Sequence, residues 1–200
     1  MTTAALLLPD ATSRAPAVHC LAGDASVAAA VVLGDAARIL VAEDAGDRSD
    51  QLAEEFTTMA RRGAPLGAIA ALLDDVVTSW GGSGAMATLV DARADDFTVL
   101  HRGGPTPIVM SATGSLTRIV AATPGPPIGP HDAVTTIRHG ERHTVQPDDV
   151  LVLTTPSGID DAIAALASAA GPTWDDVRYA LTRDGLTPNA HEAFALAHFH

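Results

Sequence analysis

Two segments with helical spacing follow one another in the first half of the chain, and strand-like segments lie on both sides of the pair. The first helix is predicted over residues 50–62, with Asp50 as its N-cap, and the second over residues 65–80, ending at Gly81-Gly82. Apolar residues recur in the first at helical intervals, at Leu52, Phe56 and Met59. Because most strand-like neighbours are joined by short turns, this order favours antiparallel sheets with helices outside, an α+β fold.

Alternating apolar runs bounded by Gly, Pro and Asp predict the strands. Before the helices, residues 27–33 and 38–42 predict a hairpin. After them, four runs predict a meander: 86–91, 97–101, 106–110 and 116–120. Further strands are predicted at 134–138, 150–154 and 193–199, and further helices at 160–170 and 174–182. Residues 1–17 are expected to form a loosely ordered arm or a first edge segment, and residues 18–200 a single domain.

Composition restricts the classes of partner. The chain has 200 residues, 47% of them hydrophobic, which is enough for one well-buried domain. Its net charge is −12 and its 12 basic residues are all arginines, so we expect no binding to nucleic acid or to anionic membranes. No apolar run approaches the roughly 20 residues that span a bilayer, and the N-terminus lacks the positive region of a signal peptide. With a single cysteine, the chain is expected to be cytoplasmic.

Three segments carry a recognisable layout: GAMATLVDARADDFTVLHRGGPTPIVM from Gly84, GPPIG from Gly125, and QPDDVLVLTTPSGIDDA from Gln146. They resemble the SpoIIE-like branch of the PPM, or type 2C, protein phosphatases, whose members show a G-H-x-P-P hairpin, a P-P-L-G loop and a G-D-x-L-L-L-Y-T-D-G-V strand end. The resemblance covers most of the chain. It implies a four-layer α-β-β-α sandwich of two antiparallel sheets flanked by helices, with a metal cluster at one edge.

The resemblance also implies a ligand set for Mn²⁺ or Mg²⁺. Two such cations lower the pKa of a bridging water and neutralise charge on the transferring phosphoryl group, and carboxylates hold them. The family's G-G-D motif corresponds to Ala22-Gly23-Asp24, which retains Asp24. Its D-x-x-G motif corresponds to a segment in which Glu43 is in frame and Asp44 is adjacent. Asp24 and either Glu43 or Asp44 are therefore predicted metal ligands.

Other diagnostic positions depart from the family pattern. Ser157 stands where the family has the aspartate of T-D-G, and a neutral hydroxyl cannot replace a carboxylate charge. Gly104 stands in place of the hairpin histidine. The final aspartate falls near His191 and Glu192, so that the ligand there is His191, Glu192 or neither. Ser157, Gly104 and His191 are thus the degenerate positions of the predicted site, whereas Glu192 joins the candidate ligands.

Together these features predict a serine/threonine phosphatase-family domain of bacterial phospho-switch signalling with weak or lost activity, since loss of metal-site partners lowers affinity or activity roughly 10–100-fold or more. The resemblance implies a phosphorylated or regulatory protein partner, such as an anti-sigma-factor antagonist. One alternative is a pseudophosphatase that binds a regulatory protein or a small ligand without hydrolysis. Another is a metal-free enzyme that reuses the fold. A homodimer that associates through the helix at 65–80 is also an alternative.

Other catalytic patterns are disfavoured. Ser157 lacks the G-x-S-x-G elbow of serine hydrolases. His139 and His143 have the spacing of a helical zinc pair, but the residues around Gly140 favour extended backbone. The pair Asp160-Asp161 most simply stabilises the start of a helix, with a role as replacement metal ligands as the alternative.

Overall fold

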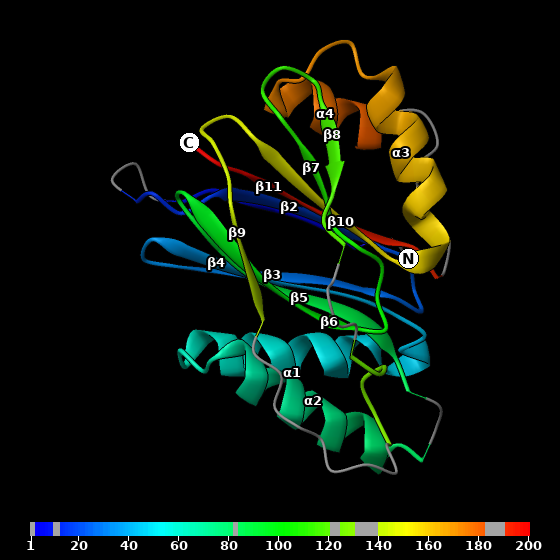
Figure 1. Cartoon of the computed structure of the whole chain (residues 1–200). Coiled ribbons are helices and arrows are strands. Elements are labelled where there is room, and N and C mark those ends of the chain that lie inside the picture. The colour runs from blue at the N-terminus through cyan, green and yellow to red at the C-terminus, as the bar shows by residue number, and fades with distance from the viewer. Residues whose placement is uncertain (1–2, 10–12, 82–83, 121–124, 131–139, 183–190) are drawn as a thin grey trace.

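The computed structural model describes residues 3–9, 13–81, 84–120, 125–130, 140–182 and 191–200. Two antiparallel sheets face each other in these residues, with α1 and α2 on the outside of one sheet and α3 and α4 on the outside of the other (Figure 1). The α+β class and the four-layer α-β-β-α order expected from the resemblance are confirmed. In the described part of the chain, no helix combines the length and apolar character needed to cross a membrane.

The six-stranded sheet joins strands that are far apart in the sequence. Its order is β1 (Thr3–Leu7), β2 (Ala17–Ala22), β11 (Ala193–His198), β10 (Val150–Thr154), β7 (Ile108–Met110) and β8 (Leu116–Arg118). The C-terminal strand β11 therefore lies between β2 and β10. Residues 3–7, expected to lie in a loosely ordered arm or a first edge segment, form an edge strand of this sheet.

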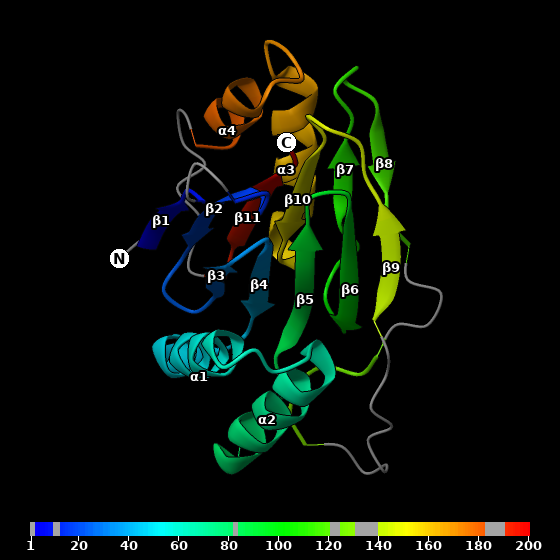
Figure 2. The same ribbon diagram turned by 90° about the vertical axis from the view of Figure 1, so that its left-hand side faces the viewer.

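The five-stranded sheet is built mostly from neighbours in sequence. Its order is β3 (Val27–Leu33), β4 (Ala36–Glu43), β5 (Met86–Arg93), β6 (Asp96–Arg102) and β9 (Glu141–Thr144), as Figure 2 shows from the side. The predicted four-strand meander was wrong, because β6 pairs with β9 while β7 and β8 belong to the other sheet. Strand β9 was not predicted, and the run predicted at 134–138 lies outside the described residues.

The helices follow the predicted apolar spacing. Their bounds are α1 (Ser49–Arg61), α2 (Leu66–Ser79), α3 (Ile159–Ser168) and α4 (Trp174–Thr182), and the short 3₁₀ helices η1 (Gly46–Arg48) and η2 (Pro156–Gly158) precede α1 and α3. The predicted N-cap was wrong: Asp50 lies in the first turn of α1, and Arg48 is the N-cap residue. Because η1 runs directly into α1, the chain is already turning before Asp50 is reached.

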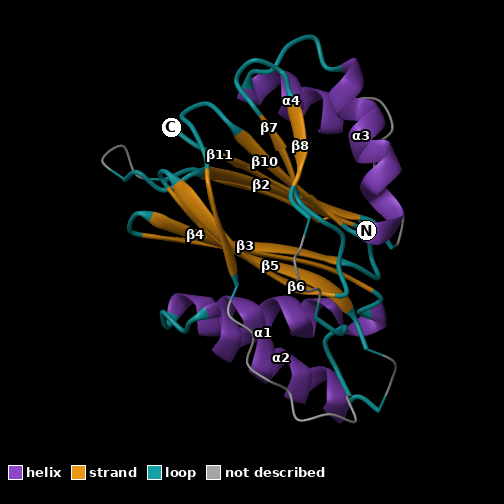
Figure 3. Cartoon of the chain, in the orientation of Figure 1, coloured by secondary structure: helices purple, strands orange, loops and turns teal. Residues whose placement is uncertain are grey.

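Helices cover the outer faces of the two sheets (Figure 3), and alternation along each strand directs side chains to both faces of its sheet. On β4, Ile39 and Val41 belong to the core between the two sheets, whereas Leu40 packs beneath α1 and α2. Phe56 of α1 is fully buried in that second layer. A third layer lies between the six-stranded sheet and helices α3 and α4. The two sheets are therefore held together by a continuous apolar core.

A buried ion pair joins α2 to β6. Arg102 Nη2 lies 2.6 Å from Asp74 Oδ1, and the two side chains are 6% and 11% exposed. The same carboxylate oxygen accepts a hydrogen bond from the backbone N–H of Gly129 at 3.0 Å. Arg102 Nε donates to the carbonyl of Pro126 at 2.8 Å. The pair thus attaches the GPPIG loop both to the helix and to the sheet.

Candidate functional site

The segments that carry the predicted ligands meet at one end of the sandwich. Ala22, at the end of β2, pairs with Ala193 at the start of β11, so the turn that contains Asp24 lies beside Glu192. The backbone N–H of Gly23 donates to the carbonyl of Glu192 at 2.9 Å, and Ser26 Oγ donates to the same oxygen at 2.6 Å. Asp24 and Glu192 are therefore held close through the main chain.

Glu43 and Ser157 are in direct contact. The Glu43 side chain is buried, and its Oε2 accepts a hydrogen bond from the backbone N–H of Ser157 at 3.1 Å. Ser157 lies in η2, which leads directly into α3. A carboxylate at the start of a helical segment is stabilised by the exposed N–H groups and the helix dipole. Glu43 thus acts as a cap that joins the end of β4 to the start of α3.

The Ser157 hydroxyl is also used to hold the main chain. Ser157 Oγ donates to the carbonyl of His191 at 3.3 Å and lies 3.3 Å from Thr155 Oγ1. Thr155 Oγ1 in turn accepts the backbone N–H of Ala193 at 3.1 Å. Since Ser157 bonds to the His191 carbonyl rather than to its imidazole, this contact differs from that of a Ser-His-Asp triad. The two hydroxyls fasten η2 to the start of β11.

Asp44 and Asp24 are exposed at this end. Asp44 has a positive φ of 64°, a conformation that Asp tolerates better than most residues. Its Oδ1 lies 3.8 Å from His191 Nδ1. Asp24 lines a pocket of about 440 Å³ together with Asp47 and other residues at the start of α1. Asp44 thus faces His191, whereas Asp24 lines the pocket beside α1.

The carboxylates do not form a donor set for two cations in this arrangement. A pair of divalent ions needs several carboxylates that converge. Glu43 Oε2 accepts a backbone N–H, and Ser157 contributes no charge. Among the residues that the structure describes, no three His, Cys, Asp or Glu side chains gather so as to hold a metal ion. In the described part of the chain these side chains do not converge as the family's Mn²⁺ or Mg²⁺ centre requires, and the assignment of Asp24, Glu43, Asp44 and Glu192 as ligands stays a prediction.

Tight packing surrounds Gly104. A Cβ at this position would lie 2.5 Å from Thr88 Oγ1 and 2.7 Å from the backbone carbon and oxygen of Ala87. Backbone atoms of a central strand cannot move aside as a flexible side chain can. Sequence comparison identifies Gly104 only as a missing histidine, whereas the structure adds that the hairpin approaches β5 too closely for any side chain here.

Burial controls the ionisation of several histidines and of the cysteine. Burial lowers the pKa of His101, which is 4% exposed on β6; His143 also lowers this pKa, and Glu141 opposes the shift. Burial also lowers the pKa of His19 and of His198. For Cys20, burial raises the pKa to about 12, so its thiol is not a reactive nucleophile at neutral pH.

The lowered pKa of His101 predicts that acid destabilises the protein. At a pH below 6.5, the ordinary pKa of a histidine, His101 binds a proton more readily in the unfolded state than in the folded state. The free energy of unfolding should therefore be lower at pH 5 than at pH 7.5. Urea unfolding at the two values measures this, and His101→Gln should show a smaller decrease than the wild type. An equal decrease in both proteins would contradict the assignment to His101.

Comparisons with known proteins agree on the architecture. The family model described as Stage II sporulation protein E (SpoIIE) matches residues 44–183. No curated protein matches the chain.

Three solved structures illustrate the likeness. The RsbU and RsbW domains of Rv1364c from Mycobacterium tuberculosis match with a TM-score of 0.64 at 16% identity, over 98% of this chain and 58% of that one. RsbX in complex with magnesium matches with a TM-score of 0.65 at 11% identity, over 98% of both chains. The PP2C phosphatase domain and a regulatory fragment of SpoIIE from Bacillus subtilis match with 0.62 at 10%, over 98% of this chain and 62% of that one. At such identities, the structural likeness shows the fold alone.

Proposed function

The chain belongs to the SpoIIE family, with the fold of the PPM (type 2C) phosphatases, and from this premise we propose that it binds a regulatory protein in a bacterial phospho-switch and hydrolyses phosphoesters weakly or not at all. Such a domain keeps the sandwich as a recognition surface while the metal site is eroded. It acts in the cytoplasm, in keeping with its single free and buried cysteine.

The contact between Glu43 and Ser157 carries this proposal. Glu43 Oε2 accepts the backbone N–H of Ser157, so this carboxylate takes part in holding the main chain. At the neighbouring position, a hydroxyl replaces the family's carboxylate and bonds to a main-chain carbonyl. Both side chains thus stabilise the join between strands and α3. The proposal treats this end of the molecule as a structural connection that has replaced a catalytic one.

The family and its relatives support the choice of partner. RsbU, RsbW and RsbX give their names to similar structures, and another similar structure comes from work on the bacterial stressosome. We therefore propose a phosphorylated or regulatory protein as partner, such as an anti-sigma-factor antagonist. The net charge of −12 disfavours nucleic acid as an alternative.

Hydrolysis of a generic phosphoester, p-nitrophenyl phosphate, in the presence of Mn²⁺ tests the loss of activity. We expect the wild type to release product no faster than Asp24→Ala, because among the described residues no three His, Cys, Asp or Glu side chains gather around Asp24 to hold a metal ion. The proposal fails if the wild type shows efficient Mn²⁺-dependent turnover that Asp24→Ala abolishes. Such a result would favour a divergent but active phosphatase.

Restoring one carboxylate should restore a response to metal. In Ser157→Asp, the new side chain lies near the Glu43 carboxylate, so we expect a lower melting temperature without metal because of like-charge repulsion. Mn²⁺ at about 100 times its Kd should then raise the melting temperature by roughly 5 °C. Ser157→Asn has the same shape without the charge and should show no response. Thermal unfolding with and without Mn²⁺ measures the difference, and an equal response in both variants would count against the inferred position of the site.

A further inference from the structure

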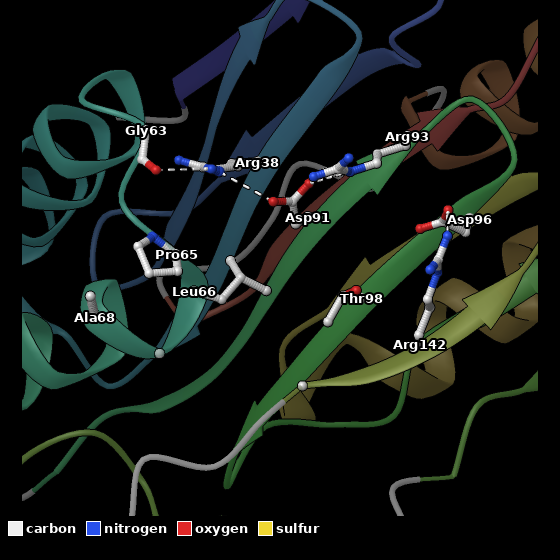
Figure 4. A pocket seen from close by; sticks show the side chains of 12 residues that line it. Arg38, Gly63, Pro65, Leu66, Ala68, Asp91, Arg93, Asp96, Thr98 and Arg142 are labelled. Atoms are coloured by element: carbon white, nitrogen blue, oxygen red, sulfur yellow. Dashed lines mark hydrogen bonds and ion pairs between the residues drawn. The ribbon is translucent and has the colours of Figure 1, made fainter.

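A second polar pocket opens at the other end of the five-stranded sheet. On β5, Met86 pairs with Glu43, whereas Asp91 pairs with Arg38 at the far end of β4. Figure 4 shows residues that line the pocket there. Its volume is about 650 Å³. Its polar lining consists of Arg38, Asp91, Arg93, Asp96, Thr98 and Arg142. It is therefore distinct from the contact between Glu43 and Ser157.

The strand register creates this lining. Arg38, Asp91, Thr98 and Arg142 lie directly opposite one another across β4, β5, β6 and β9, and so form one polar row. On the same face, two residues further along each inner strand, stand Leu40, Leu89 and Leu100, which are covered by α1 and α2. Arg93 and Asp96 extend the polar row on its other side. The pocket begins where the apolar cover of the helices ends.

The three arginines of the pocket differ in their contacts and exposure. Arg38 is fixed in the structure, because it pairs with Asp91 and donates to the carbonyls of Ala60 in the last turn of α1 and of Gly63 after the helix. Arg93 is 63% exposed, and its Nε lies 3.7 Å from Asp91 Oδ1, beyond hydrogen-bonding distance. Arg142 is 71% exposed and contacts Asp96 Oδ2 at 2.5 Å through one Nη atom. Arg93 and Arg142 thus keep donors that a ligand can use.

The charge balance of the pocket is positive. Three guanidinium groups face two carboxylates, Asp91 and Asp96, which leaves a net charge of +1 in a chain whose overall charge is −12. The opposite wall comes from the start of α2, where Pro65 and Leu66 supply apolar surface. No acidic residue lies in the first turn of this helix, so nothing there repels an anion. The pocket therefore combines donors for one negative group with an apolar wall.

We propose that this pocket binds a small organic anion, with its phosphate or carboxylate group between Arg93 and Arg142 and its remaining atoms against Pro65 and Leu66. Guanidinium groups recognise both kinds of oxyanion through paired N–H donors. The volume lies within the range of about 300–1,000 Å³ that is typical of small-molecule sites, which favours a free small molecule over a protein segment. The proposal does not depend on whether the Ser157 end is active.

Calorimetric titration of the full chain with citrate and with inorganic phosphate tests the proposal. The double variant Arg93→Gln/Arg142→Gln should bind citrate at least about tenfold more weakly than the wild type, because charge-assisted hydrogen bonds are lost. The matched control Arg118→Gln/Arg178→Gln removes the same charge from β8 and α4, on the other side of the sandwich. Because neither arginine lines the pocket, this control should bind citrate with an affinity within about twofold of that of the wild type. Circular dichroism of both variants checks that each is folded.

Three outcomes would overturn the proposal. The first is that neither citrate nor phosphate binds to the wild type. The second is that the wild type, the double variant and the control bind citrate equally well. The third arises from a further titration with a phosphoserine hexapeptide and its unphosphorylated counterpart. If the phosphopeptide alone binds, and does so through Arg93 and Arg142, then the occupant is a protein segment and the small-molecule assignment is wrong.

Discussion

Replacing Asp74 with alanine is expected to lower the free energy of unfolding by about 3–5 kcal/mol, because it removes one partner of a buried ion pair. The guanidinium of Arg102 would stay buried without this carboxylate, and the N–H of Gly129 would lose its acceptor. The GPPIG loop would then be held to α2 less firmly. For a domain of this size, such a change lowers the melting temperature by on the order of 10 °C.

Urea unfolding measures this effect, and the neighbouring residue provides a matched control. Asp75 is exposed on the same helix, so Asp75→Ala should change the free energy of unfolding by less than about 0.5 kcal/mol. The double variant Asp74→Ala/Arg102→Ala should lose less than the sum of the two single variants, because the partners interact directly. Equal stability of Asp74→Ala and Asp75→Ala would show that the buried pair is not a stabilising contact.

Alanine at Gly104 is expected to cost about 1–3 kcal/mol of stability through overpacking. Its Cβ would overlap the backbone of Ala87 and the hydroxyl of Thr88, and only the hydroxyl can be removed by mutation. The double variant Thr88→Ala/Gly104→Ala should therefore recover only part of the loss measured by urea unfolding. Full recovery would mean that the main-chain approach is looser than the structure indicates. Histidine at this position should be tolerated less well than alanine.

The local parts of the fold were predictable because the signals for them are local. The spacing of Leu52 and Phe56 places both on one face of α1, and this face is buried. The distribution of strands between the sheets depends instead on pairing between remote segments. Strand β9 carries polar residues along its length and lies at a sheet edge, so no alternating apolar pattern marked it. The assumption that consecutive strands stay in one sheet produced the incorrect meander.

Family motifs could indicate which segments meet at the candidate site, but not how their side chains bond. Motif matching brought Glu43 and Ser157 into one hypothesis, and the structure places them in contact. Their hydrogen bond links residues 114 positions apart, so no local pattern revealed that the carboxylate serves as a cap. No sequence motif indicated the arginine-lined pocket. Arg38 and Arg142 come to lie in one row only through the register of four strands.

The position of β11 has a consequence for how the protein is made. During translation the five-stranded sheet gains β3 to β6 in order, and contacts between consecutive strands form early. The six-stranded sheet cannot be completed until residues 193–198 emerge from the ribosome, because β11 pairs with both β2 and β10 and joins them. Until then, both strands present unpaired edges to other chains. The nascent chain is therefore most exposed to aggregation in the interval before β11 becomes available for pairing, when chaperones would protect it best.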